Sequence, residues 1–129
     1  MRDYQRRTGK YILPTPIYHQ VIWIIRDFYR MSEEAEAILH ESPGPSDGMP
    51  RGQGGTSDPN AAKAIKREEL LRKVDIVDKS LKTIPPEYRQ GVWQNILYHS
   101  PFPMDAARSA YGKYKSRFVW EVAHRLNLI

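Results

Sequence analysis

The closing segment of the chain, residues 108–129, contains the side chains best suited to binding chemistry. In the stretch RSAYGKYKSRFVWEVAHRLNLI, cations are interspersed with aromatic rings, and residues 106–129 contain one acid, Glu121, against five Lys and Arg residues. On a helix, the polar side chains opposite the apolar stripe of this segment form one row. Long cationic side chains reach phosphates, whereas Arg and Ser bind base edges in the major groove of DNA. The segment therefore predicts DNA contact through Ser109, Lys113, Ser116, Arg117, Trp120 and His124, with Arg108 and Lys115 near the DNA backbone.

The same row has two other interpretations. A basic helix face can be merely solvated, although such a face more often mixes Lys with Glu. The row can also bind an acidic protein surface, and a Trp120 that is exposed within it is hard to explain by solvation. Solvation, nucleic-acid binding and protein binding are therefore all open at this point.

No arrangement typical of an enzyme or a metal centre occurs in the sequence. There is no Cys, which excludes disulfides, thiolate catalysis and Cys-based zinc sites. The GQGG stretch lacks the Lys-Ser or Lys-Thr pair that completes a phosphate-binding loop. The histidines lie in separate predicted elements without metal-ligand spacing, and these are His19, His40, His99 and His124. We expect no catalytic residues, no cofactor and no bound metal, and hence not an enzyme.

An apolar seam near the N-terminus predicts the first long helix. A Thr-Pro pair at 15–16 is typical of a helix start, and apolar residues at alternating steps of four and three follow from Ile17 to Ile38. This pattern predicts a helix over about 16–40. The next segment, 42–57, contains five Gly and three Pro residues and predicts a mobile loop.

A second seam matches the first. An Asp-Pro pair at 58–59 precedes apolar residues from Leu70 to Ile84, which predicts a helix over about 59–83. Two helices with matching seams and a flexible connection favour a long antiparallel helical hairpin. We therefore divide the chain into a basic arm and long helix (1–41), a flexible Gly/Pro linker (42–57), and a second long helix with a C-terminal module (58–129).

Prolines mark the helix boundaries expected in the C-terminal module. The stretch IPPE at 84–87 ends the second helix and starts a third over about 86–98, with Val92 and Ile96 facing inward. A short connection, HSPFPMD, leads to a last helix from about 106 or 109 to 127. Its predicted inward stripe consists of Tyr111, Tyr114, Phe118, Val122 and Leu126. Because no alternating apolar and polar segment suggests a strand, the fold class is all-α: the hairpin followed by a compact helix-turn-helix-like module.

The charge of the chain is concentrated at its two ends. The net charge is +5, with six basic and two acidic residues in 1–31, one basic and six acidic in 32–60, and thirteen basic and seven acidic in 61–129. This asymmetry is a weak hint of a polyanionic partner. No apolar run approaches the ~20 residues of a membrane span, and the basic start is not followed by a signal-peptide core. We expect a cytoplasmic protein without a membrane partner.

The C-terminal module resembles a known class of DNA-binding module. The stretch from Ile84 to the end is similar to the sigma-factor region that binds the −35 promoter element, and more similar to phage late-gene transcription regulators of the RinA/ArpU type and related prophage proteins of Firmicutes. In these modules a short helix precedes the recognition helix, whereas PFPMDAARSAYG leaves room here for one helical turn at most. The positions that carry the resemblance are Ile84, Pro85, Glu87, Tyr88, Arg117, Phe118, Ala123 and Leu126.

The resemblance implies a phage or prophage DNA-binding transcription regulator whose partner is double-stranded DNA in a bacterial host cell. An alternative from another class is a small phage protein that binds or inhibits a host nucleic-acid-handling complex, such as RNA polymerase or a defence nuclease. A packaging adaptor that binds DNA without regulating it is a third possibility. The regular seam from Ile17 to Ile38 can be satisfied within one hairpin or between chains, and the sequence does not choose between them. Because phage regulators usually act on DNA as multimers and an exposed Trp23 could extend an intermolecular surface, we expect a homodimer.

Overall fold

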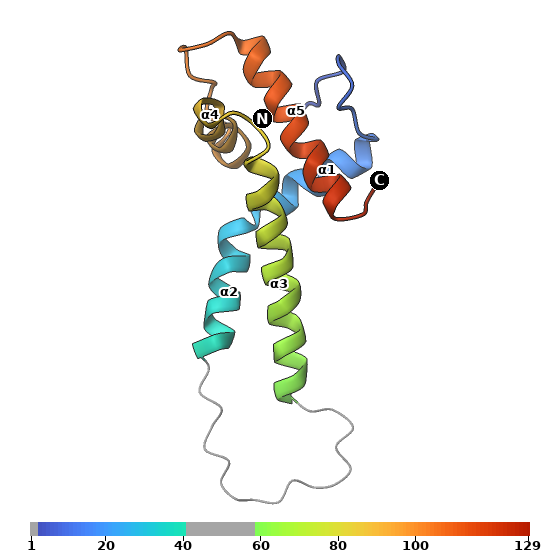
Figure 1. The fold of residues 1–129 in the computed structure, drawn as a ribbon, viewed down its shortest axis with the longest axis vertical. Coiled ribbons are helices and arrows are strands. Elements are labelled where there is room, and N and C mark those ends of the chain that lie inside the picture. The colour runs from blue at the N-terminus through green and yellow to red at the C-terminus, as the bar shows by residue number, and fades with distance from the viewer. Residues whose placement is uncertain (1–2, 41–58) are drawn as a thin grey trace, which may run out of the picture.

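The computed structural model describes residues 3–40 and 59–129, and this part of the chain is all-α (Figure 1). No strand occurs in the described residues, so the predicted all-α class is confirmed. None of the described helices is long and apolar enough to cross a membrane. The predicted linker, 42–57, lies outside the described residues. The helices are α1 (Thr15–Arg26), α2 (Phe28–His40), α3 (Pro59–Leu81), α4 (Pro86–Tyr98) and α5 (Arg108–Arg125).

The first long helix differs from the prediction, because α1 and α2 are separate helices with Asp27 between them. The Asp27 N–H is shared between the carbonyls of Trp23 and Ile24, at 3.1 Å from each, and the chain changes direction at this point (Figure 1). The two halves of the seam pack in different places. Residues such as Ile22 in α1 belong to the main core, whereas Met31 in α2 belongs to a second, smaller core.

The smaller core joins α2 to α3. These two helices run antiparallel, side by side, and project from the rest of the molecule (Figure 1). Met31, Ala35 and Leu70 are buried between them. At the surface, Lys66 of α3 reaches Glu34 of α2 at 2.6 Å. We refer to this pair of helices as the hairpin.

The main core is built around α5, which contacts α1, α3 and α4. Its predicted inward residues Tyr111, Phe118 and Val122 are buried, and so are Val119 and Ala123, which the predicted stripe omits. The predicted stripe assumes that α5 packs against one neighbouring helix. Because three helices contact α5, a wider part of its surface is buried. The helix α4, over Pro86–Tyr98, begins and ends where the sequence predicts.

The connection between α4 and α5 brings these helices close together. It contains a turn at 104–106 but no further helix, in agreement with the expectation of one helical turn at most. His99 ends α4 in the left-handed region, with φ of 55°. Gly91 of α4 lies so near the next segment that an added Cβ would be 2.6 Å from the Tyr111 ring and 2.7 Å from Pro103 Cδ. This close approach fixes the position of the first turn of α5.

Candidate functional site

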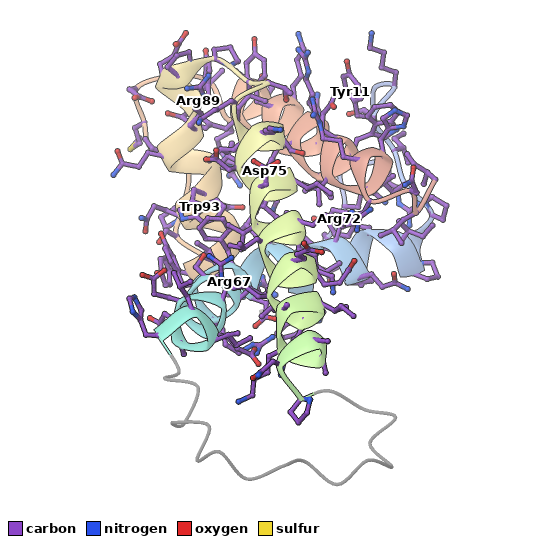
Figure 2. All side chains as sticks on the ribbon, turned by 60° about the horizontal axis from the view of Figure 1, so that its bottom comes forward. Tyr11, Arg67, Arg72, Asp75, Arg89 and Trp93 are labelled. Carbon is purple, nitrogen blue, oxygen red and sulfur yellow. The ribbon has the colours of Figure 1, made fainter. Side chains whose placement is uncertain are left out.

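An extended N-terminal arm, residues 3–14, lies against α5 on the side where the sequence predicts DNA contact. Arg6 Nη1 donates a hydrogen bond to the carbonyl oxygen of Ser109 at 3.3 Å. Further along the arm, the Tyr11 ring packs edge-on against Trp120, with ring centroids 5.5 Å apart. Figure 2 shows Tyr11 at the opposite end of the molecule from Arg67 of the hairpin. The arm therefore covers part of the predicted contact face.

Contacts within the arm and to α1 fix its path. The side chain of Gln5 pairs with the backbone of Leu13: its Nε2 donates to the Leu13 carbonyl at 2.8 Å, and its Oε1 accepts from the Leu13 N–H at 2.7 Å. Gly9, at φ of +92°, adopts a backbone conformation in the loop that L side chains rarely take. Leu13 is buried in the main core, and Tyr18 of α1 donates from its hydroxyl to the Tyr4 carbonyl at 3.2 Å. The arm is thus a closed loop anchored at both ends.

The eight residues predicted to contact DNA do not form one exposed row. Arg108, Ser109, Lys113 and His124 are exposed, whereas Lys115, Ser116, Arg117 and Trp120 are only partly exposed. Trp120 packs between Tyr11 and His124, and it stacks on the imidazole of His124 at 5.0 Å with 9° between the planes. The predicted exposed row of Lys113, Arg117, Trp120 and His124 is therefore interrupted, since Tyr11 of the arm covers Trp120 and Arg117 is only partly exposed.

Lys115 and Arg117 are held by their surroundings. Lys115 Nζ donates to Asn95 Oδ1 of α4 at 2.8 Å, and burial lowers the pKa of Lys115 while the charge of Asp3 opposes that shift. The Nε of Arg117 is enclosed and has no hydrogen-bond partner among the residues that the structure describes. Neither side chain is therefore free to extend outward from α5 towards a DNA duplex.

The structure adds side chains from the arm to the exposed cations of α5. Arg6, Lys10, Arg108 and Lys113 are all exposed, and none of them forms an ion pair within the described residues. We call these four residues the basic surface. A hollow of about 230 Å³ separates arm from helix, and no acid lines it; its lining is Arg6, Thr8, Gly9, Lys10, Tyr11, Lys113 and Ser116. Sequence reasoning missed the arm residues, although the basic excess at both ends was a signal for them.

Cations on the hairpin have a different environment. Lys66, Lys79 and Lys82 each lie within 3.0 Å of a carboxylate oxygen, and Arg30 binds both Asp27 and Glu34 at 2.6 Å. Exposed pairs of this kind contribute little to stability, but they cancel charge locally. These pairs cancel the charge of several cations in this part of the molecule, whereas the four cations of the basic surface have no acidic partner within the described residues.

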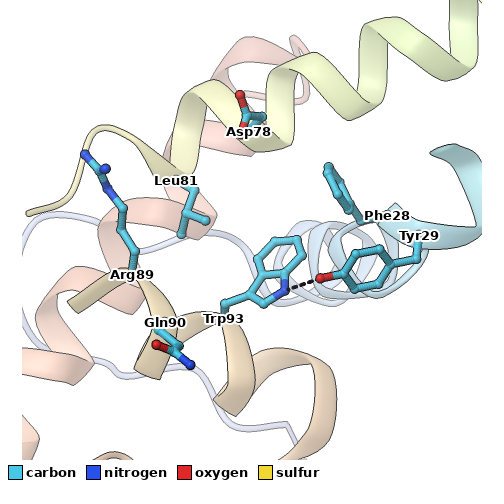
Figure 3. Close-up of a pocket in the computed structure, with 7 residues that line it drawn as sticks. All are labelled: Phe28, Tyr29, Asp78, Leu81, Arg89, Gln90 and Trp93. Atoms are coloured by element: carbon cyan, nitrogen blue, oxygen red, sulfur yellow. Dashed lines mark hydrogen bonds between the residues drawn. The ribbon is translucent and has the colours of Figure 1, made fainter. Parts of the chain in front are cut away.

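A second concave feature lies where α2, α3 and α4 meet (Figure 3). Phe28, Tyr29 and Trp93 pack edge to face around it, and Trp93 Nε1 donates to the Tyr29 hydroxyl at 3.1 Å. The pocket has a volume of about 390 Å³. Two of its polar residues are engaged elsewhere: Asp78 binds Lys82, and Arg89 donates to the carbonyls of Lys82 and Ile84. The pocket is largely an aromatic surface with few polar groups left to orient a ligand.

In the part of the chain that the structure describes, no group of three or more His, Asp or Glu side chains is placed to hold a metal ion. No family model, curated protein or solved structure matches the chain.

Proposed function

We propose that the protein binds DNA through the basic surface formed jointly by the arm and α5. The supporting observation is that four exposed cations from opposite ends of the sequence gather without any acidic partner. Arrays of uncompensated Lys and Arg attract phosphates and release the counterions condensed on a nucleic acid. The further role of a phage transcription regulator rests on the resemblance of residues 84–129 to regulators of that class.

The geometry favours contacts with phosphates over contacts with bases. Lys113, Arg6 and Lys10 are exposed cations, which suit phosphate oxygens. Arg117 and Trp120, which we expected to reach base edges, are partly covered. Binding should therefore depend strongly on salt and weakly on DNA sequence.

A titration of a short DNA duplex by fluorescence anisotropy at several salt concentrations tests the proposal. For the wild type, log K should fall linearly with log salt, with a slope of about −0.9 per phosphate contacted. Lys113→Ala and Arg6→Ala should each weaken binding to all sequences similarly and flatten the slope by about one unit. The matched control is Lys79→Ala, which removes one positive charge from the ion pair with Asp75 on the hairpin and should leave the slope unchanged.

Two outcomes would contradict the proposal. One is the absence of salt-dependent binding at about 50 mM salt, where phosphate contacts are strong. The other is an equal effect of Lys79→Ala and Lys113→Ala, which would show that net charge matters but the position of the charge does not.

The cluster of Tyr11, Trp120 and His124 beside the basic surface favours a second candidate, which is binding to an acidic protein such as RNA polymerase or a nuclease. Partly exposed aromatic residues are frequent anchors of protein interfaces. Trp120→Ala distinguishes the candidates: a phosphate-binding surface should lose little affinity for DNA, whereas a protein anchor should lose most of its affinity for its partner.

A further inference from the structure

The carboxylate of Asp3, at the start of the arm, is bound by Arg26, lies near His99 and is affected by the charge of Lys115. Arg26 of α1 binds both carboxylate oxygens, with Nη2–Oδ1 of 2.6 Å and Nη1–Oδ2 of 2.8 Å. His99, which follows α4, has its Nδ1 3.9 Å from Asp3 Oδ1 and its Nε2 3.2 Å from Arg26 Nη2. Lys115 of α5 is near enough for its charge to act on Asp3 as well. We call Arg26, His99 and Lys115 the cationic site.

The helices position the cationic site without help from the arm. Arg26 Nε donates to the Ile96 carbonyl at 2.8 Å, and Lys115 Nζ donates to Asn95 Oδ1 at 2.8 Å. The His99 N–H donates to the Asn95 carbonyl at 3.0 Å, which fixes the backbone of that residue. The side chains of Arg26 and Lys115 and the backbone of His99 are thus tied to the last turn of α4. The anion at their centre, in contrast, comes from a peripheral segment.

An anion is required at this position. The Arg26 side chain is 13% exposed and that of Asp3 is 18% exposed, so the pair is largely removed from water. Removing one partner of such a pair leaves a charge that is poorly solvated and uncompensated. Among the other groups of this region, Asn95 is neutral and the Tyr18 hydroxyl donates to a backbone carbonyl. If Asp3 moves away, an external anion has to take its place or the site loses stability.

We propose that Arg26, His99 and Lys115 form a binding site for a phosphate-class oxyanion, which Asp3 occupies while the arm is closed. The planar guanidinium of Arg26 presents paired N–H donors, which match two oxygens of a phosphate as well as those of a carboxylate. An incoming phosphate displaces Asp3 and frees the start of the arm. The phosphate belongs either to a free phosphorylated molecule or to a nucleic-acid backbone. This site is separate from the basic surface, and it does not depend on the proposed DNA binding.

Displacement of Asp3 also has consequences for the basic surface. Arg6 and Lys10 of that surface belong to the same arm, and Tyr11 covers Trp120. Release of the arm moves two cations away from α5 and uncovers the indole. The cationic site thereby links oxyanion binding to the shape of the basic surface.

Tryptic cleavage of the arm after Arg6, Arg7 and Lys10, followed by mass spectrometry, reports how often the arm opens. For the wild type, we expect inorganic phosphate to accelerate this cleavage in a saturable way, beyond the effect of chloride at equal ionic strength. The side-chain NMR signals of His99 should shift with the same saturation curve. For Asp3→Ala the arm should be cleaved rapidly without phosphate. That variant should bind phosphate at least about tenfold more tightly, because the closed arm no longer competes.

Lys115→Met is the matched control, since it retains the Asp3–Arg26 pair and the apolar stem but removes one charge of the site. It should weaken phosphate binding in the Asp3→Ala background. Circular dichroism first checks that each variant is folded, and Asp3→Asn replaces Asp3→Ala if the latter is not. A short DNA duplex in place of phosphate distinguishes the two sources: acceleration by duplex alone assigns the site to backbone phosphates. Equal effects of phosphate, duplex and chloride, or an Asp3 variant whose His99 signals do not respond to either ligand, would overturn the proposal.

Discussion

Phe118 and Arg117 are neighbours on α5 with opposite environments. The Phe118 ring is completely buried, with Trp93 at 6.3 Å between ring centroids. Arg117 is partly exposed, but its Nε is enclosed without a hydrogen-bond partner. A buried ring contributes through its packing, whereas an enclosed donor without a partner costs free energy. The two side chains should therefore have opposite effects on stability when they are replaced.

We expect Phe118→Ala to lower the free energy of unfolding by about 3–5 kcal/mol, because it removes a large side chain and leaves a cavity. Arg117→Met, which keeps a long apolar stem, should be neutral or slightly stabilising because the unsatisfied Nε is removed. Urea denaturation monitored by circular dichroism measures both. A loss of more than about 1 kcal/mol for Arg117→Met, which is typical for a lost hydrogen bond, would show that its guanidinium has a partner.

Two glycines determine how closely other segments approach α4 and α5. A Cβ on Gly91 would meet the Tyr111 ring at 2.6 Å, whereas a Cβ on Gly112 would meet the Arg6 side chain at ordinary contact distance, with Cδ at 3.6 Å. Gly91→Ala should therefore destabilise by about 1–3 kcal/mol through overpacking. Gly112→Ala should stabilise by about 0.5–1 kcal/mol, because Gly in a helix interior costs about that much relative to Ala. Thermal unfolding of the two variants checks the contrast, and equal shifts of Tm in one direction would contradict it.

The elements themselves were largely predictable from sequence, but the break at Asp27 was not. Pro85 and Pro86 fix the start of α4, so its bounds agree with the prediction. The seam from Ile17 to Ile38 keeps one spacing throughout, although its two halves pack against different helices. Spacing records which side of a helix is buried. It does not record which partner buries that side, and this is why one helix was predicted where two exist.

The candidate site was predictable only in part, for a related reason. Lys113 was identified because its helical position places it opposite the apolar stripe. The packing of Tyr11 against Trp120 was not predicted, since the arm has no apolar periodicity. Arg6 and Ser109, which are in contact, are 103 residues apart in the sequence. Contacts between an irregular segment and a distant helix depend on the complete fold, and no local pattern encodes them.

At the scale of the whole molecule, the fold brings cations from the two ends of the chain together. Arg6 and Lys10 of the arm and Arg108 and Lys113 of α5 form no ion pair within the described residues, whereas Lys66 and Lys79 of the hairpin are paired with acids. The packing of Leu13 and Tyr18 in the main core brings the N-terminal arm to the C-terminal helix. Because both ends are basic, their meeting concentrates the positive charge of the chain on one region. Asp3 is the acid at the edge of that region, and its ionisation should influence the stability of the whole molecule.

Ion pairs of carboxylates with Arg and Lys make the stability of the protein depend on pH in the acid range. Hydrogen bonds from Arg26 and Arg30 lower the pKa of Asp3 and of Asp27, respectively, and the hydrogen bond from Lys66 does so for Glu34. The folded state binds fewer protons than the unfolded state wherever a carboxyl pKa is depressed. The stabilisation is therefore complete above the unfolded pKa values and is lost as pH falls through the lower, folded values.

We expect Tm to be nearly constant at moderately acid pH and to fall steeply below about pH 4, where these carboxylates become protonated. Asp3→Asn provides the control, since it removes the Asp3–Arg26 ion pair at every pH. Its Tm should be lower than that of the wild type at neutral pH, and the difference should shrink as pH falls, because wild-type Asp3 then also loses its charge. Differential scanning calorimetry between about pH 7 and pH 2 measures both curves. A difference in Tm that is the same at both ends of this range would show that Asp3 stabilises the arm by packing rather than by charge.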